Sequence, residues 1–579
     1  MWAVDAFDVS VVLVLALIAL SAVVIVIAAL ARGGGEVGGW EVRGAWPRVR
    51  AVARVTLAEA VRMKIVVVFL VLLAGTLPLL CLTARGDGTI RGQVQMFIGY
   101  AIGLTGFYLA LLTIFFSSRT LAAEIASRQI FGLVSKPVPR WQILAGKWLG
   151  IMTLNALMVA MALGVTYGGV RWLVGRFERE LAAELVHRGG LTRDQAEGGI
   201  NAIRRPVSPA REAATNPVIA ALAGSLGWSD DQTVELLLRL PEPTRMNLRR
   251  LNELRRQVLV ARASIQPDAP DLRNEVEERF ELLRQQGRLP TSPHWTPDKV
   301  REEIRLSLLN EHLSLPPMRA RQWVLKGPPP VSGEDRLVSV RYKLDASIYT
   351  GEAALIDGSV LPENTLATRW IIGDPAKGGT FGVVRIEINR AFHEIDVPPH
   401  CVEPDGTVFV RLENIDPRRV DIVVPLGEGL EVLYRVASFE RNLARAAPAL
   451  LVPLALLASF GLLMSTFCTY PVAAMVTLSL FAVANSRAFL SEALYIAPYQ
   501  ASPTTLIGRD ALRAKLTTTL FDVLSTGKLD PANKTLDGRA IGWAELGREA
   551  GTVAGLRGGA SLFLAVLILR RRELAAEIV

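Results

Sequence analysis

The sequence predicts an α-helical polytopic membrane protein of about seven spans with an extracytoplasmic α+β insertion. Two observations predict this class. The chain of 579 residues is 51% hydrophobic and has long runs without a charged residue, which is typical of integral membrane proteins. A long charged stretch, residues 175–445, separates two groups of these runs. We therefore expect the apolar runs to cross a membrane and the charged stretch to fold outside it.

The first group contains four apolar runs, each long enough to cross roughly 30 Å of hydrocarbon as a helix. They are Val9–Ala31, Ile65–Ala84, Met96–Phe116 and Trp148–Val170. A cleaved signal peptide is the rival interpretation of the first run. That interpretation needs a basic segment before a short apolar one, and the sequence has neither. We expect four spans.

The second group predicts three further spans. The charge-free stretch Ala446–Ser486 is too long for one crossing, and Cys468–Pro471 interrupts it where a proline would end a helix. This pattern predicts a tight helical hairpin. Gly551–Leu569 is the last expected span and contains Arg557. A charge within a span is a functional candidate, and the alternative is that Arg557 extends to the outer head groups.

Basic residues predict the orientation. They gather in residues 32–64, in residues 117–147 and in the tail after Leu569. Because Lys and Arg beside spans tend to stay cytoplasmic, we expect these segments and the C-terminus inside, and residues 175–445 outside, a bacterial inner (cytoplasmic) membrane. The net charge of +9 then belongs largely to membrane flanks that meet lipid head groups. We expect no nucleic-acid partner.

The insertion changes texture along its length. Its first part has helical runs broken by prolines, which are Val234–Leu240, Met246–Ala263, Leu272–Gln286 and Asp298–Leu313. Its second part alternates apolar and polar residues between turns, in Leu337–Leu344, Leu366–Ile372, Phe381–Ile388, Thr407–Leu412 and Val420–Val424. The second pattern predicts a small β-sandwich. It leaves open whether this module binds a ligand or acts as a spacer.

These patterns divide the chain into five regions. They are an extra span with a cytoplasmic linker (1–53), three spans with a connector helix and a coupling segment at 117–147 (54–174), a helical extracytoplasmic region (175–330), an extracytoplasmic β-sandwich (331–445), and a hairpin of two spans, an outer loop at 487–550, a last span and a basic tail (446–579).

No motif predicts catalysis or metal binding. Gly373–Thr380 has the composition of a phosphate loop but not its order, and no helix follows it. His393, Glu394 and His400 lack the helical spacing of a zinc motif in a strand-rich region with two adjacent prolines. Cys401 is the only cysteine of the insertion, so we expect it buried and without a disulfide. The chain is predicted to be no enzyme and to bind no cofactor.

The coupling segment, residues 117–147, lies between two predicted spans. Apolar residues such as Leu121, Ile125 and Phe131 can line one face of a short helix, with Arg119 and Glu124 on the remainder. Such a helix can dock into a partner protein or lie on lipid. Periodicity alone does not decide between these interpretations.

A family resemblance bears on that choice. Glu124, Gly132–Arg140 and Gly146–Gly150 resemble the E…G…L.SKPV.R…GK..G pattern of permease subunits of ATP-binding cassette exporters of the second type. Arg54–Lys64 resembles the amphipathic connector of that family, and Phe563–Leu574 resembles its ending. The most similar subgroup includes permeases associated with multi-copper enzyme maturation and gliding. The resemblance covers about residues 54–172 and 441–574, and the first span and the insertion depart from it.

The resemblance implies a transport subunit that works with partners. A separate cytoplasmic ATPase subunit would hold ATP and magnesium, and a second permease chain, identical or related, would complete the pathway. The residues implied to couple to the ATPase are Arg119, Glu124, Arg128, Phe131, Lys136, Pro137 and Arg140. Gly146, Lys147 and Gly150 are expected at a helix-packing position, since small residues at this spacing let helices approach closely in lipid.

Two other classes stay open. A membrane-anchored extracytoplasmic scaffold or receptor would use the β-sandwich to bind protein or glycan and the spans as an anchor. A membrane enzyme would need acidic or histidine residues in or beside its spans, and the charge-free stretch Ala446–Ser486 argues against it.

Overall fold

The chain divides into two compact units in a computed structural model. We call residues 1–177 with 438–579 the helical unit, and residues 178–437 the insert unit. The described residues are 45–127, 138–202, 240–289, 296–327, 338–346, 355–356, 359–360, 362, 364–374, 379–427, 429–485 and 529–571. Each unit is described by itself.

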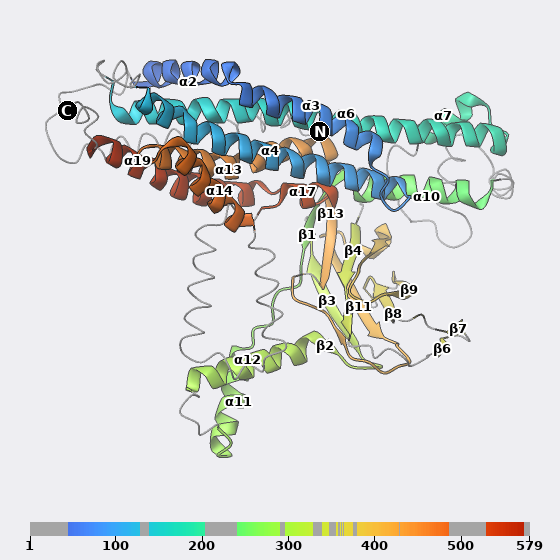
Figure 1. Cartoon of the computed structure of the whole chain (residues 1–579). Coiled ribbons are helices and arrows are strands. Elements are labelled where there is room, and N and C mark those ends of the chain that lie inside the picture. Colours follow the sequence, from blue (N-terminus) through green and yellow to red (C-terminus); the bar gives the residue numbers. More distant parts are fainter. Residues whose placement is uncertain are drawn as a thin grey trace. The chain divides into compact units, whose positions relative to one another are not determined.

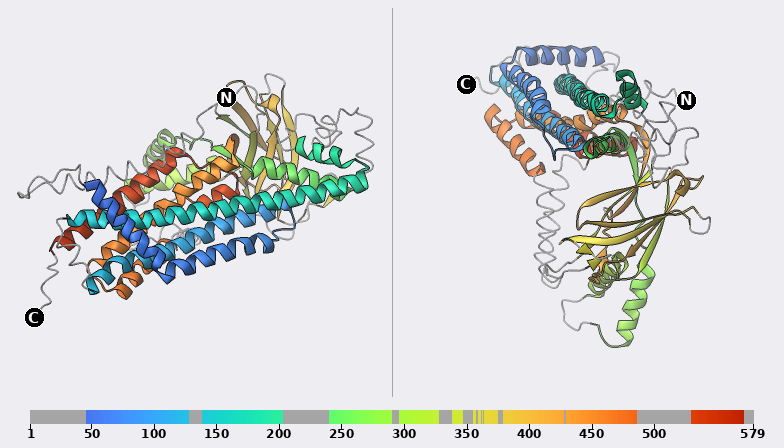
Figure 2. Two further views of the ribbon diagram at one scale, coloured as in Figure 1. Left: turned by 90° about the horizontal axis from the view of Figure 1, so that it is seen from above. Right: turned by 90° about the vertical axis from the view of Figure 1, so that its right-hand side faces the viewer.

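The helical unit consists of long apolar helices. In order, its elements are α2 (Ala45–Arg62), α3 (Lys64–Thr83), α4 (Ile90–Ala126), α6 (Arg140–Gly189, which continues into the insert unit), α13 (Phe439–Ser465), α14 (Tyr470–Asn485), α17 (Pro531–Leu536), α18 (Trp543–Glu549), the π-helical η4 (Ala550–Gly558) and α19 (Gly559–Arg571). In both views α3, α4 and α6 run side by side (Figures 1 and 2).

Among the described residues, five helices are long and apolar enough to cross a membrane. They are α3, α4, α6, α13 and the continuous helix Trp543–Arg571. Each contains or overlaps one of the predicted spans, which supports a multi-pass membrane protein. α14, the second arm of the predicted hairpin, has 16 residues, or about 24 Å of helix, and Val9–Ala31 lies outside the described residues. The count of seven spans stays a prediction.

The hairpin turn lies where the sequence predicts it. α13 ends at Ser465 and α14 begins at Tyr470, and the Ala473 N–H donates to the Thr469 carbonyl at 2.9 Å. Pro471 falls in the first turn of α14, where a missing N–H leaves no helical bond unmade.

The coupling segment begins inside α4 rather than as a separate helix. Residues 117–126 continue α4 because no proline or glycine interrupts them, and the helix ends with Ser127 as its C-cap. The expectation of an independent short helix is therefore wrong for this part. Leu121, expected on its apolar face, is buried in the helical unit, as is its neighbour Ala122. Residues 128–137 lie outside the described residues.

The insert unit contains a β-sandwich. One sheet has the strand order β1-β13-β4-β10 and the other β3-β11-β8-β9 (Figures 1 and 2). Their strands are β1 (Val260–Ile265), β3 (Ala320–Lys326), β4 (Val338–Lys343), β8 (Thr365–Ile372), β9 (Phe381–Ile388), β10 (Phe392–Val397), β11 (Thr407–Asn414) and β13 (Leu430–Ser438). Val340 and Tyr342 of the first sheet share one apolar core with Trp370 and Val410 of the second. The rings of Tyr342 and Trp370 are 4.1 Å apart.

Smaller elements complete the insert unit. A third sheet joins β2 (Ser314–Leu315), β12 (Ile422–Val423) and β5 (Asp345–Ala346), and β6 (Leu355–Ile356) pairs with β7 (Ser359–Val360). The helices are α7 (Arg193–Ala202), α10 (Glu242–Gln257), α11 (Arg273–Gln285) and α12 (Pro297–Leu313), with a 3-10 turn η2 at Pro399–Cys401. α11 and α12 pack on each other through Phe280 and Ile304.

The insertion was predicted correctly in part. α10, α11 and α12 match three of the expected helical runs, whereas Val234–Leu240 lies almost entirely outside the described residues. Val260–Ala263, expected as helix, belongs to β1, because this segment pairs with the edge of the first sheet and buries Val260 and Ala261. β3 also lies in the range expected to be helical, so the sandwich draws on residues before 331.

Besides β1 and β3, two further strands of the sandwich were not expected, β10 and β13. β13 is buried along most of its length, so its residues lack the alternation that identified the other strands. Cys401 is buried, as expected, and its thiol donates to the Gly379 carbonyl oxygen at 3.4 Å. His393 and Glu394 lie on β10, which excludes the helical spacing of a zinc motif there.

Candidate functional site

A buried ion pair joins the end of α4 to the beginning of α6. Lys147 Nζ lies 2.6 Å from Glu124 Oε1, and the two side chains are 2% and 13% exposed. The same ammonium donates to the Thr120 carbonyl oxygen at 3.4 Å. Glu124 Oε2 is buried and accepts no hydrogen bond from the described part of the chain. The pair therefore fixes the two helices on either side of residues 128–137.

A second carboxyl group faces this pair from α2. Burial raises the pKa of the half-buried Glu59 more than the nearby positive charge of Lys147 lowers it, and the charge of Glu124 raises it further. We call Glu59, Glu124 and Lys147 the junction cluster. It brings two acids and one base together from three helices, and the positive charge of Arg119 also acts on Glu59.

Two glycines set the contact between α2 and α6. A Cβ atom at Gly146 would lie 2.6 Å from Val52 Cβ and 2.8 Å from the Val49 carbonyl oxygen. A Cβ atom at Gly150 would lie 2.8 Å from Thr56 Cβ. Because the two glycines stand one helical turn apart, they form a single flat strip on α6 against which α2 lies.

Two arginines tie the same ends of α4 and α6 to other helices. The Arg119 guanidinium carbon lies 6.0 Å from the ring centroid of Tyr470, the first residue of α14. Arg140, the first residue of α6, donates to the carbonyl oxygen of Leu569 near the end of α19. The coupling segment, the hairpin turn and the C-terminal helix therefore meet at one end of the helical unit.

Buried polar contacts continue along the same helices. Trp148 donates through its indole N–H to Ser459 Oγ at 2.9 Å on α13, and Asn155 donates to Thr113 Oγ1 at 2.8 Å on α4. A Cβ atom at Gly461 would lie 1.9 Å from Ser117 Oγ, so α4 and α13 are also in close contact. These hydrogen bonds fix α4, α6 and α13 in register.

The structure brings together six of the ten predicted residues. Arg119, Glu124, Arg140, Gly146, Lys147 and Gly150 lie at this end of the helical unit, whereas Arg128, Phe131, Lys136 and Pro137 lie outside the described residues. Glu124 points to Lys147 rather than to solvent, and Lys147 is an ion-pair partner in addition to lying between the packing glycines.

Sequence reasoning missed several members of the site. Glu59, Trp148 and Ser459 were not singled out. Each of them meets the rest of the site through helices that lie far apart in the chain, which the spacing of residues does not reveal. The described residues contain no group of histidine, cysteine and acidic side chains that could hold a metal ion.

Comparison with known proteins adds no relative. No family model, curated protein or solved structure matches the chain. The site is therefore interpreted from its own contacts. They hold α2, α4 and α6 together on either side of residues 128–137.

The close contact between α2 and α6 predicts the effect of one methyl group. We expect Gly150→Ala to lower the free energy of unfolding by about 1–3 kcal/mol, because the new Cβ meets the Ala53 carbonyl oxygen at 2.9 Å, which cannot rotate away. Thermal unfolding in detergent measures the effect.

Gly164→Ala, on the same helix, is the matched control. A Cβ atom there has no neighbour within 4 Å, so alanine should be neutral or slightly stabilising through its higher helix propensity. Equal melting temperatures for the two variants would contradict the α2–α6 contact.

Proposed function

We propose that the chain is the transmembrane permease subunit of an ATP-binding cassette exporter. A separate cytoplasmic ATPase subunit hydrolyses ATP and moves the segment between α4 and α6, and these helices carry the movement into the membrane. The chain itself performs no chemistry and works with a second permease chain. Residues 175–445 face the extracytoplasmic side.

The observation that supports the proposal best is the junction cluster. Glu124 and Lys147 hold both ends of residues 128–137, and Gly146 and Gly150 hold α2 on the same strip of α6. A force on the connecting segment therefore acts on three helices at once rather than on a loose loop. A segment of the chain that only lies on lipid does not require this bracing.

The contacts of Arg119 with Tyr470 and of Arg140 with Leu569 support the proposed orientation. They join the coupling segment to the end of α19, which leads into the basic tail, and both of these carry basic residues that predict a cytoplasmic position. They also join the coupling segment to the hairpin turn at Tyr470, which the predicted order of spans places on the same side. This end of the helical unit is then the one that meets a soluble partner.

Affinity purification of the chain from its native membrane tests the proposal. Mass spectrometry should find a protein with the phosphate-binding sequence GxxxxGK[ST] in the purified complex. Phe131→Ala should reduce its recovery at least several-fold while membrane insertion stays unchanged. Phe107→Ala is the control, since Phe107 is an exposed phenylalanine within the apolar part of α4.

Two results would overturn the proposal. One is a wild-type chain that purifies without an ATPase, which would instead support a membrane-anchored binding protein that uses the β-sandwich. The other is an Arg128→Cys variant that an impermeant thiol reagent labels only from the extracytoplasmic side.

A further inference from the structure

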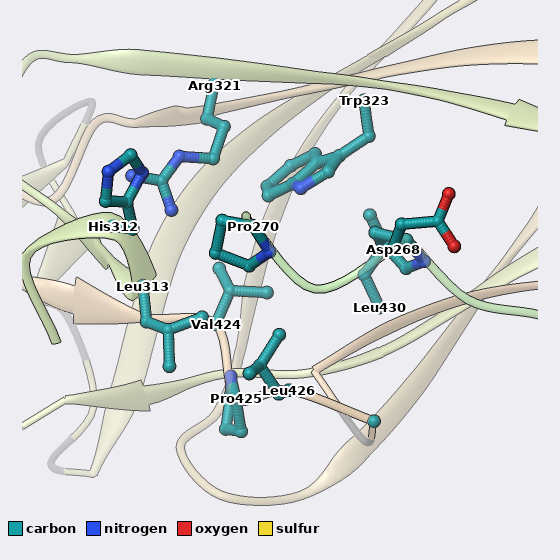
Figure 3. A pocket seen from close by; sticks show the side chains of 12 residues that line it. Asp268, Pro270, His312, Leu313, Arg321, Trp323, Val424, Pro425, Leu426 and Leu430 are labelled. Carbon is teal, nitrogen blue, oxygen red and sulfur yellow. The ribbon is translucent and has the colours of Figure 1, made fainter. Parts of the chain in front are cut away.

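A cavity of about 180 Å³ opens at one end of the β-sandwich. It lies beside β3, between the segment that follows β1 and residues 424–427 with Leu430 (Figure 3). The side chains that matter for a ligand are Pro270, His312, Arg321, Trp323, Val424 and Leu430. All of them belong to the insert unit.

Arg321 places a cation in this cavity. Its Nη2 atom donates to the Ser314 carbonyl oxygen at 2.9 Å, and no described carboxylate lies within 4.0 Å of its guanidinium. Burial lowers the pKa of Arg321, which means that water solvates the charge less than at an exposed position. A half-buried arginine with one neutral acceptor retains donors for a further group.

The other ionisable side chains of the cavity do not neutralise Arg321. A histidine carries no negative charge, and His312 Nε2 lies 3.0 Å from Glu275 Oε2. Asp268 is exposed and lies at the opposite side of the cavity, beyond Pro270 and Trp323 (Figure 3). An anion beside Arg321 would meet a positive end of the cavity.

Apart from Arg321, His312 and Asp268, the side chains that line the cavity are apolar. Trp323 stands two residues after Arg321 on β3, so both side chains extend from the same face of that strand. Pro270 lies between them in Figure 3, and Val424 and Leu430 are buried beneath. An apolar cavity of about 150 Å³ is known to hold benzene, so this space suits one ring and a small polar group.

We propose that this cavity binds a small organic monocarboxylate that carries one flat apolar ring, with the carboxylate on Arg321 and the ring against Trp323. Arginine favours this chemistry because its planar donors match the two oxygens of a carboxylate. The inference does not depend on the proposed transport function, since the binding measurement needs no ATPase.

Binding of phenylacetate to the full chain in lipid nanodiscs tests the inference. Equilibrium dialysis with radiolabelled phenylacetate, corrected with empty nanodiscs, should give saturable binding. Neutral phenylacetamide should compete at least about tenfold more weakly, because a hydrogen bond to a charged group contributes about 1.5–3 kcal/mol. Arg321→Gln should weaken phenylacetate binding by a similar factor.

Arg319→Gln is the matched control. It removes the same charge two residues earlier, at an exposed position outside the cavity, and should leave binding unchanged. Trp323→Leu should weaken phenylacetate and phenylacetamide alike, since it removes the ring contact and not the charge. The inference is overturned by absence of saturable binding, by equal competition from the amide with the wild-type chain, or by equal losses in the Arg321 and Arg319 variants.

Discussion

Replacing Lys147 by methionine is expected to lower the free energy of unfolding of the helical unit by about 3–5 kcal/mol. Glu124 would then keep a buried carboxylate without a cation, and the cost of that unpaired charge outweighs the apolar gain from the methionine. Methionine has a similar shape to the lysine stem, so a packing defect does not explain a loss of this size.

The loss can be measured by thermal unfolding of the purified chain in detergent. Lys534→Met is the control, because Lys534 also pairs with a glutamate, Glu545, but their side chains are 26% and 43% exposed. An exposed pair contributes at most about 1 kcal/mol. Equal effects of the two substitutions would show that the Lys147 pair is not buried.

The double variant Lys147→Met/Glu124→Leu tests whether the loss in Lys147→Met comes from the unpaired charge of Glu124. Removing both charges leaves no buried ion, and a hydrophobic replacement of a buried pair is often neutral or stabilising. We expect the double variant to recover most of the stability that Lys147→Met loses. If the ATPase still co-purifies with it, the pair serves folding alone.

The second large effect is expected in the insert unit, for Asp416→Asn. Asp416 and Arg418 form a two-pronged ion pair at 2.7 and 2.9 Å with both side chains almost fully buried, and Asp416 Oδ2 accepts the Ala367 N–H at 3.1 Å. Removing the negative charge leaves Arg418 as an uncompensated buried cation. We therefore expect the free energy of unfolding of the insert unit to fall by about 3–5 kcal/mol.

The same pair predicts a pH dependence. Burial alone would raise the pKa of Asp416, but hydrogen bonds from Arg418 and from the Ala367 N–H outweigh burial, and the pKa lies below its usual value. Its contribution to stability is therefore present above about pH 3.9, the unfolded value, and is lost as the pH falls through the lower folded value. The difference in free energy of unfolding between the wild type and Asp416→Asn should therefore become smaller below about pH 4.

Hydrogen exchange of β8 peptides in the full chain reads out this stability. Asp345→Asn is the control, since Asp345 pairs with Arg390 at 2.7 Å with both side chains exposed, and we expect a loss of at most about 1 kcal/mol there. If the free energies of unfolding of the wild type and Asp416→Asn differ by the same amount from pH 7 to pH 3, the pKa of Asp416 is not lowered by this ion pair.

The sequence predicts the helical elements well where the physical signal is local. Apolar runs long enough to cross a bilayer identified α3, α4, α6 and α13, and Pro471 marked the hairpin turn. Strand β1 was assigned to a helix because Val260–Ala263 follows a helical pattern directly, and its pairing with β13 depends on residues far along the chain.

The candidate site was likewise predicted only where the signal is local in the sequence. A repeat of small residues at four-residue spacing pointed to Gly146 and Gly150 as a packing strip, and the structure supplies α2 as the helix that occupies it. The partner of Lys147 could not be read from spacing, because Glu124 is 23 residues away and reaches it only once α4 and α6 lie antiparallel. The role of this cluster in transport remains a prediction.

The insert unit is joined to the rest of the chain without a linker at either crossing. α6 runs unbroken through the boundary at Phe177 and Glu178, and β13 ends at Ser438, directly before α13 begins at Phe439. Domain boundaries usually fall in flexible segments. Here the backbone at both crossings belongs to regular secondary structure. Grafting a foreign module in place of this one would consequently require a substitute that begins in a helix and finishes in a strand, which restricts recombination at these joints.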